Sequence, residues 1–215
     1  MRALLVTNDF PPRPGGIERF VHNLAVRLPA DSLVVYASSR AGAGPGTRRA
    51  ARREEIAKFD ADQPFEVVRE RTGMLLPTPV IARRAAQVAL AHGCDTVWFG
   101  AAAPLGLLAG GLRQRARIRR AVALTHGHET GWAALPGARR LLRRIGREND
   151  VLTYLGAYTR ERLARALGGG VTRLEQLAPG VDVTTYHPGV DGGAIRLRHG
   201  LSGRPVVVCV SRLVP

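Results

Sequence analysis

The chain is poor in aromatic residues and has two cysteines, and both scarcities narrow its interpretation. Aromatic side chains make up 5% of the sequence, so the core must be built mainly from Ala, Val and Leu. The bases of single-stranded nucleic acid need aromatic platforms to stack on, and we therefore expect no nucleic-acid partner. Cys94 and Cys209 lack CxxC spacing, so we expect two buried, reduced thiols.

Long apolar runs are also missing. No run reaches the roughly 18 residues that a membrane-spanning helix needs. The apolar stretch after Arg2 is short, is followed by Asn8 and Asp9, and has no small-residue cleavage site of the kind that ends a signal peptide. These features predict a cytoplasmic protein.

The charge is strongly one-sided, with 32 basic against 17 acidic residues and a formal net charge of +15. Lys58 is the only lysine. The planar fork of arginine suits phosphate groups, as in nucleic acids, anionic lipids or nucleotide sugars. A bias in codon composition is the alternative, since Ala and Gly are abundant too. It accounts for the choice of Arg over Lys better than for the net excess.

Apolar strands alternate with helical patterns along most of the chain. We expect strands over 3–7, 32–37, 65–69 (near an edge), 95–99, 121–125, 151–154 and 174–177. We expect helices over 17–28, 48–58, 80–91, 139–146 and 158–167, and one opened by Pro104. This alternation predicts an α/β fold with a Rossmann-like, doubly wound parallel sheet, in which ligands bind beyond the carboxyl ends of the strands.

The last part of the sequence predicts a second domain that is truncated. We assign residues 1–178 to the first domain and the Pro- and Gly-rich stretch 179–204, with one short helix over 191–199, to an interdomain linker. Residues 205–215 read as the first strand of a nucleotide-sugar-binding domain and the turn after it. An uncovered strand of this kind would be prone to aggregation.

Two motifs follow strands of the first domain. Gly15 and Gly16 precede a helix, where glycines let the backbone approach a phosphate and helix N–H groups bind it; a simple tight turn is the alternative. His126, in Thr-His-Gly-His-Glu, can donate to a sugar hydroxyl or a developing negative charge. His128 could have a purely structural role. No cysteine or third histidine lies nearby, so we expect no metal.

Arginines supply two further candidate sites. Arg212 leaves the predicted strand at 205–210 and could grip a diphosphate bidentately, or could be a solvated side chain. Basic residues alternate with apolar ones around the loop Met74-Leu75-Leu76, which we expect to be exposed. This mixture suits an anionic membrane and a lipid acceptor, although a solvated helix face would look similar. The basic residues of this region proposed for membrane or acceptor contact are Arg48, Arg49, Arg52, Arg53, Arg83 and Arg84.

Four segments together carry a family resemblance. Residues 8–20, 125–132, 177–188 and 210–214 occur in the order and with the motifs of the retaining glycosyltransferases of family 4, and the chain resembles these enzymes over nearly its whole length. The resemblance implies the N-terminal half of a GT-B fold. Within the family, the sequence is most similar to actinobacterial phosphatidylinositol mannosyltransferases. That implies GDP-mannose as the donor, a phosphatidylinositol mannoside as the acceptor, and a peripheral position at the inner face of the plasma membrane.

The resemblance also implies roles for single residues. Gly15 and Gly16 would face the diphosphate of the donor, His126 would lie at the reaction centre, and Arg212 would stabilise the departing GDP. Catalysis would need no metal or other cofactor, and transfer would retain the configuration of the sugar. The second basic residue and the downstream ExxxxxxxE motif of the family are not in this chain. We therefore expect the 215 residues alone to be inactive.

Two other functions stay open on the sequence. One is a family 4 glycosyltransferase that uses a soluble or polysaccharide acceptor. The other is a non-catalytic fragment that binds membranes or polyanions.

Overall fold

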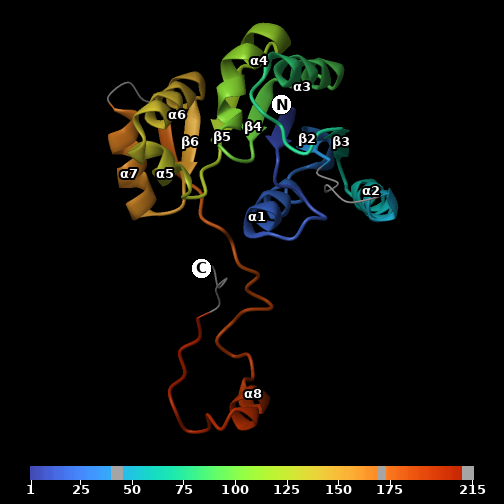
Figure 1. Cartoon of the computed structure of the whole chain (residues 1–215). Helices are drawn as coiled ribbons and strands as arrows, with labels where there is room; N and C mark the ends of the chain where they lie inside the picture. The colour runs from blue at the N-terminus through green and yellow to red at the C-terminus, as the bar shows by residue number, and fades with distance from the viewer. Residues whose placement is uncertain (40–45, 169–172, 210–215) are drawn as a thin grey trace. The chain divides into compact units, whose positions relative to one another are not determined.

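The computed structural model describes residues 1–39, 46–168 and 173–209, with only the backbone for 46–49. Its centre is a parallel sheet with the strand order β3-β2-β1-β4-β5-β6-β7 (Figure 1). The strands are β1 (Ala3–Thr7), β2 (Leu33–Ser38), β3 (Glu66–Glu70), β4 (Thr96–Phe99), β5 (Arg120–Ala123), β6 (Val151–Tyr154) and β7 (Arg173–Gln176). The predicted Rossmann-like parallel sheet is confirmed, and the segment predicted near an edge, now β3, is an edge strand.

Helices connect successive strands, as parallel pairing requires. They are α1 (Gly16–Ala25), α2 (Gly46–Ala61), α3 (Pro79–Ala91), α4 (Ala109–Ala116), α5 (Glu129–Ala134), α6 (Pro136–Glu148), α7 (Ala157–Leu167) and α8 (Gly193–Arg198), with 3-10 turns η1 (Ala30–Ser32) and η2 (Leu105–Leu108). Two local predictions were wrong. The helix predicted over 48–58 is longer, and Pro104 is followed first by the η2 turn and only then by α4.

The sheet has an apolar core on each face, because side chains alternate along a strand. Leu4 and Val6 of β1 belong to one core, to which α3, α4, α6 and α7 contribute. Ala3 and Leu5 belong to the other, which α1 covers. Few aromatic side chains are needed, since alanines let α3 approach the sheet closely; Ala82, Ala85, Ala86 and Ala89 are all buried. Both faces are therefore covered, as expected for a parallel sheet.

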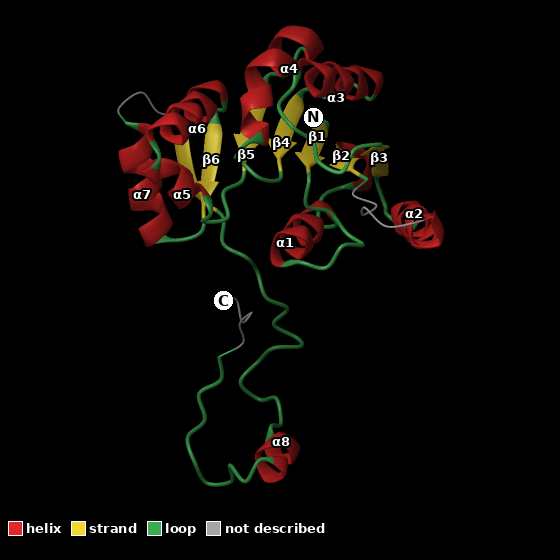
Figure 2. Cartoon of the chain, in the orientation of Figure 1, coloured by secondary structure: helices red, strands yellow, loops and turns green. Residues whose placement is uncertain are grey.

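By its contacts the chain divides into two compact units, 1–179 and 180–215. In the second unit, Figure 2 shows one short helix, α8, between loops. The strand predicted over 205–210 is not formed over 205–209, the part of it that the structure describes, because a strand needs a hydrogen-bonded neighbour. Val207 is accordingly 97% exposed. For the same reason Cys209 is exposed, so only Cys94 fits the prediction of buried thiols.

A buried tyrosine makes the stability of the sheet sensitive to alkaline pH. The hydroxyl of Tyr36 donates to Oε2 of Glu70 at 2.7 Å. Burial first, and this hydrogen bond second, raise the pKa of Tyr36 well above its ordinary value of 10.0. The folded protein keeps this proton at pH values where the unfolded chain has lost it. Its free energy of unfolding should therefore fall above pH 10, by about 1.4 kcal/mol per pH unit from this group.

Urea unfolding between about pH 9 and about pH 11 measures this slope. The variant Tyr36→Phe has no proton to lose and should show a shallower fall over the same range. Equal slopes for the two proteins would mean that Tyr36 does not set the alkaline limit of stability.

Candidate functional site

His126 lies just beyond the carboxyl end of β5, where the fold places ligands. Its Nε2 lies 2.6 Å from the carbonyl oxygen of Gly100, which follows β4. A carbonyl can only accept, so Nε2 carries the proton and Nδ1 is the ring nitrogen left to act on a ligand. Gly100 must lack a side chain here, because a Cβ would lie 2.4 Å from Oγ1 of the buried Thr7.

A buried carboxylate fixes the backbone of this histidine. Glu129, the first residue of α5, is fully buried, and its Oε2 accepts the N–H of His126 at 3.0 Å. Its Oε1 lies 3.3 Å from Nε2 of His128, whose ring stacks on that of His126 with a centroid separation of 6.3 Å. His128 is therefore the outer neighbour of Glu129, consistent with the structural role that the sequence left open.

The glycine loop lies at the end of β1 and begins α1. Gly15 precedes the helix, and the carboxylate of Glu18 folds back so that a Cβ on Gly15 would lie 2.0 Å from Oε2. Nε of Arg13 lies 2.8 Å from Oε1 of the same carboxylate. Gly16, in contrast, has open space where its Cβ would stand. In this structure Gly15 thus accommodates a carboxylate of the chain itself, and Gly16 is the open position of the loop.

The helix α1 links this loop to His126. Phe20, on the helix that Gly16 begins, meets the imidazole of His126 edge-on with ring centroids 5.6 Å apart. The glycine loop and the histidine therefore lie at the same edge of the sheet, although 110 residues separate Gly16 from His126 in the sequence. Their proposed roles toward a donor sugar stay predictions.

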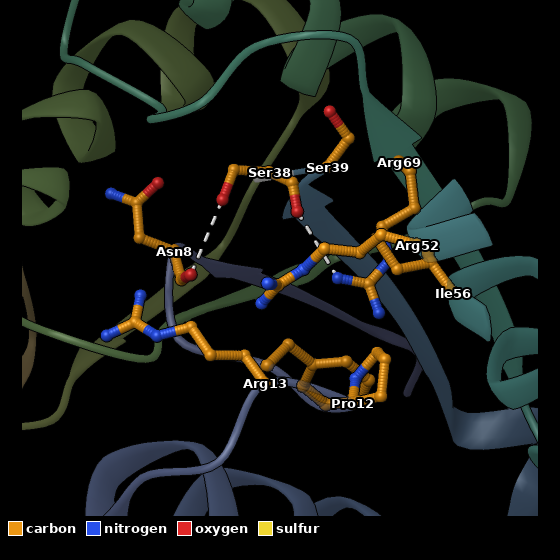
Figure 3. A pocket seen from close by; sticks show the side chains of 9 residues that line it. Asn8, Pro12, Arg13, Ser38, Ser39, Arg52, Ile56 and Arg69 are labelled. Atoms are coloured by element: carbon orange, nitrogen blue, oxygen red, sulfur yellow. Dashed lines mark hydrogen bonds between the residues drawn. The ribbon is translucent and has the colours of Figure 1, made fainter. Parts of the chain in front are cut away.

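A small pocket lies nearby, between the ends of β1 and β2 and the helix α2 (Figure 3). Its lining is rich in arginine and hydroxyl groups. The residues are Asn8, Phe10, Pro12, Arg13, Ser38, Ser39, Arg52, Ile56 and Arg69. Neither Gly15 nor His126 lines it, so the pocket is distinct from the features that the motifs predicted.

Arg69, from β3, holds the walls of this pocket together. It binds both carboxylate oxygens of Asp60 on α2, with Nε–Oδ2 and Nη2–Oδ1 distances of 3.0 and 2.7 Å. It also donates to the carbonyls of Ser38 on β2 and Pro11 in the β1–α1 loop. Its side chain is 13% exposed and that of Asp60 15%. Arg69 is therefore a structural arginine whose donors are largely occupied.

The predicted basic surface is only partly free. Arg52, Arg53 and Arg83 are exposed, whereas Arg84 forms an ion pair with the buried Glu70. Arg48 and Arg49 lie on α2, and their side chains are outside the described part of the structure.

The apolar loop beside this surface also departs from the prediction. Met74 and Leu76 are exposed as predicted, but Leu75 is buried. The amide of Asn8 holds Leu75, accepting its N–H at 2.6 Å and donating to its carbonyl at 3.0 Å.

Arg212 lies outside the described residues, so the structure does not place it. Within the part that the structure describes, no three metal-ligating side chains gather, and no helix is long and apolar enough to cross a membrane.

Sequence reasoning missed Glu18 and Glu129. Both lie three residues after the backbone position they approach, a spacing typical of helix N-termini that could have revealed them. No local signal could have revealed the bonds from Arg69 to Pro11 and from Asn8 to Leu75, which join distant segments.

The chain is similar to known glycosyltransferases over its whole length. Residues 14–185 match the profile of Glycosyltransferase Family 4. The GDP-mannose-dependent alpha-(1-6)-phosphatidylinositol monomannoside mannosyltransferase of Mycolicibacterium smegmatis is 49% identical, over 99% of this chain and 53% of that protein. The GDP-mannose-dependent monoacylated alpha-(1-6)-phosphatidylinositol monomannoside mannosyltransferase of Corynebacterium glutamicum is 42% identical, over 100% and 54%. The chain thus spans about half the length of these curated relatives.

Solved structures support the fold. Anabaena HepE in complex with UDP and glucose superposes with a TM-score of 0.60 at 15% identity, covering 93% of this chain and 50% of that one. The N-terminal domain of Candida albicans trehalose-6-phosphate phosphatase gives a TM-score of 0.54 at 11% identity, covering 93% and 53%. The predicted architecture, one half of a GT-B fold, is confirmed.

Proposed function

Because this chain belongs to glycosyltransferase family 4, we propose that it is the acceptor-binding half of a mannosyltransferase. The donor would be GDP-mannose and the acceptor a phosphatidylinositol mannoside, the substrates in the names of relatives 42–49% identical to it. One observation supports this above all. His126 and the glycine loop, far apart in sequence, lie at the ligand-binding edge of the sheet and contact one helix.

The geometry suits a reaction that needs no metal. Nε2 of His126 is held by Gly100, so Nδ1 would face the sugar near the reacting carbon. The open N-terminus of α1 at Gly16 would lie toward the diphosphate, where helix N–H groups favour negative charge. Arg212 would offset the charge of the leaving GDP. We propose front-face attack by the acceptor hydroxyl with retention, in which the leaving phosphate takes the acceptor proton.

A membrane-facing surface is part of the proposal. Met74, Leu76 and Val80 are exposed around the start of α3, and Arg83 is exposed one turn further on. Exposed apolar groups beside arginine match the interface of an anionic bilayer, to which each basic residue near the headgroups adds about 1 kcal/mol. We propose that this surface brings the enzyme to the inner face of the plasma membrane, where its lipid acceptor would lie.

A chimera tests the function. The chain replaces the corresponding half of the M. smegmatis relative, and transfer of radiolabelled mannose from GDP-mannose to phosphatidylinositol monomannoside is measured. We expect the chimera to transfer mannose and the 215-residue chain alone to show none, because the substrates must be oriented between two domains.

The matched control is the same chimera assayed with a soluble mannoside acceptor, which we expect it to ignore. A folded chimera that binds GDP-mannose but mannosylates no lipid would refute the assigned acceptor. Transfer by the chain alone would refute the division of the site between two domains.

A further inference from the structure

The pocket at the ends of β1 and β2 contains a cation that the fold itself does not use. Figure 3 shows the side chain of Arg52 extending from α2 across the pocket toward the β1–α1 loop. Within the described part of the chain, its guanidinium has no hydrogen bond and no ion pair. Arg69, on the opposite wall, is bound to Asp60 and two carbonyls. The pocket thus has a rigid wall and one free guanidinium.

Other polar groups of the lining can also turn to a ligand. Nη1 of Arg13 is buried and has no hydrogen-bond acceptor among the residues described; its nearest carboxylate oxygen, Oδ1 of Asp9, is 3.7 Å away. The hydroxyls of Ser38 and Ser39 donate to carbonyls over 3.4 and 3.3 Å. These distances exceed the roughly 2.7–2.8 Å typical of such bonds, so an anion could compete for both hydroxyls.

We infer that this pocket binds a phosphate-type anion, with the guanidinium groups of Arg52 and Arg13 and the hydroxyl of Ser38 as its ligands. Arginine forks and hydroxyl groups are the side chains that bind phosphate oxygens best. The inference deepens the proposed function and rests on it in one respect. On that function, the anion is the phosphodiester of the lipid acceptor, and the pocket would hold the headgroup while the sugar reaches His126.

Ligand chemistry at this position is independent of the general basic surface. Arg53 is the next residue on α2, is exposed as Arg52 is, and does not line the pocket. A diffuse attraction to anionic lipid would depend on both arginines equally, whereas a bound phosphate would depend on Arg52. This pair therefore provides a variant and its matched control that differ only in position.

The experiment titrates the whole 215-residue chain with three probes by isothermal calorimetry or vesicle sedimentation. The probes are inorganic phosphate, glycerophosphoinositol as the soluble phosphodiester, and phosphatidylcholine vesicles with or without phosphatidylinositol. The proteins are the wild type, Arg52→Gln and Arg53→Gln, with thermal melting as the check on folding. We expect Arg52→Gln to weaken glycerophosphoinositol binding about tenfold or more, and Arg53→Gln to leave it within about twofold.

The probes separate the sources of the anion. Saturable binding of glycerophosphoinositol that depends on Arg52 supports a lipid headgroup, and binding of inorganic phosphate alone with the same dependence supports a free phosphate. Equal losses in both variants, or no binding of either soluble probe, overturn the inference. These readouts involve no sugar transfer. The pocket can therefore fail while the chimera is active, or bind its anion while the chimera is inactive.

Discussion

Replacement of Arg69 by alanine is expected to lower the free energy of unfolding by about 3–5 kcal/mol, the range for removing one partner of a buried ion pair. Its side chain and that of Asp60 are each about one-seventh exposed, so the carboxylate left behind would be largely desolvated without a partner. Two carbonyls, of Ser38 and Pro11, would lose a donor as well. Since these groups lie on α2, β2 and the β1–α1 loop, the loss should also loosen the pocket.

Urea unfolding measures this loss, and Arg71→Ala is the matched control. Arg71 lies just after β3, and its side chain is exposed. Its removal should change the free energy of unfolding by no more than about 0.5 kcal/mol, as at most surface positions. In thermal melting, Arg69→Ala should lower Tm by about 2–4 °C for each kcal/mol lost. A loss no larger than that of Arg71→Ala would show that other contacts fix α2.

The regular part of the fold was predictable because its causes are local. Residues 3–7 and 33–37 are apolar throughout, which is the pattern of a strand buried on both faces, and the helical segments between strands then require a parallel sheet. Residues 205–209 have the same composition but no strand. Pairing depends on a partner that the sequence segment does not contain, so composition alone could not decide it.

The candidate site was predictable only where a motif lies next to a strand end. The topology rule placed Gly16 and His126 at one edge from their positions in the sequence. It could not show that Glu18 fills the space beside Gly15, or that Arg69 is occupied by Asp60, because side-chain partners depend on packing. The same limit applies to the basic residues. Sequence treated Arg52, Arg53 and Arg84 alike, whereas one lines a pocket, one lies on the surface and one pairs with Glu70.

In an enzyme with both domains, His126→Ala is expected to reduce mannose transfer about 100- to 1000-fold, the range found when one group that stabilises developing charge is removed. The proposed role leaves Nδ1 directed at the sugar, since Nε2 is bound to the carbonyl of Gly100. The affinity for GDP should stay within about twofold, because the donor nucleotide would contact the other domain. The measurement is transfer of radiolabelled mannose to phosphatidylinositol monomannoside by the chimera, with GDP binding measured separately.

A structural effect of this substitution must be separated from a chemical one, because His126 also packs on Phe20. Thermal melting of the 215-residue chain carrying His126→Ala provides that readout, and a fall in transfer without a matching fall in Tm assigns the loss to chemistry. The control is His92→Ala, which removes the same ring at the end of α3 on the opposite edge of the sheet. Arg2 binds only the backbone carbonyl of His92, which alanine keeps. Full transfer by the His126→Ala chimera would remove this histidine from the reaction, and the glycine loop would then be the only part of the predicted site left on this chain's described residues.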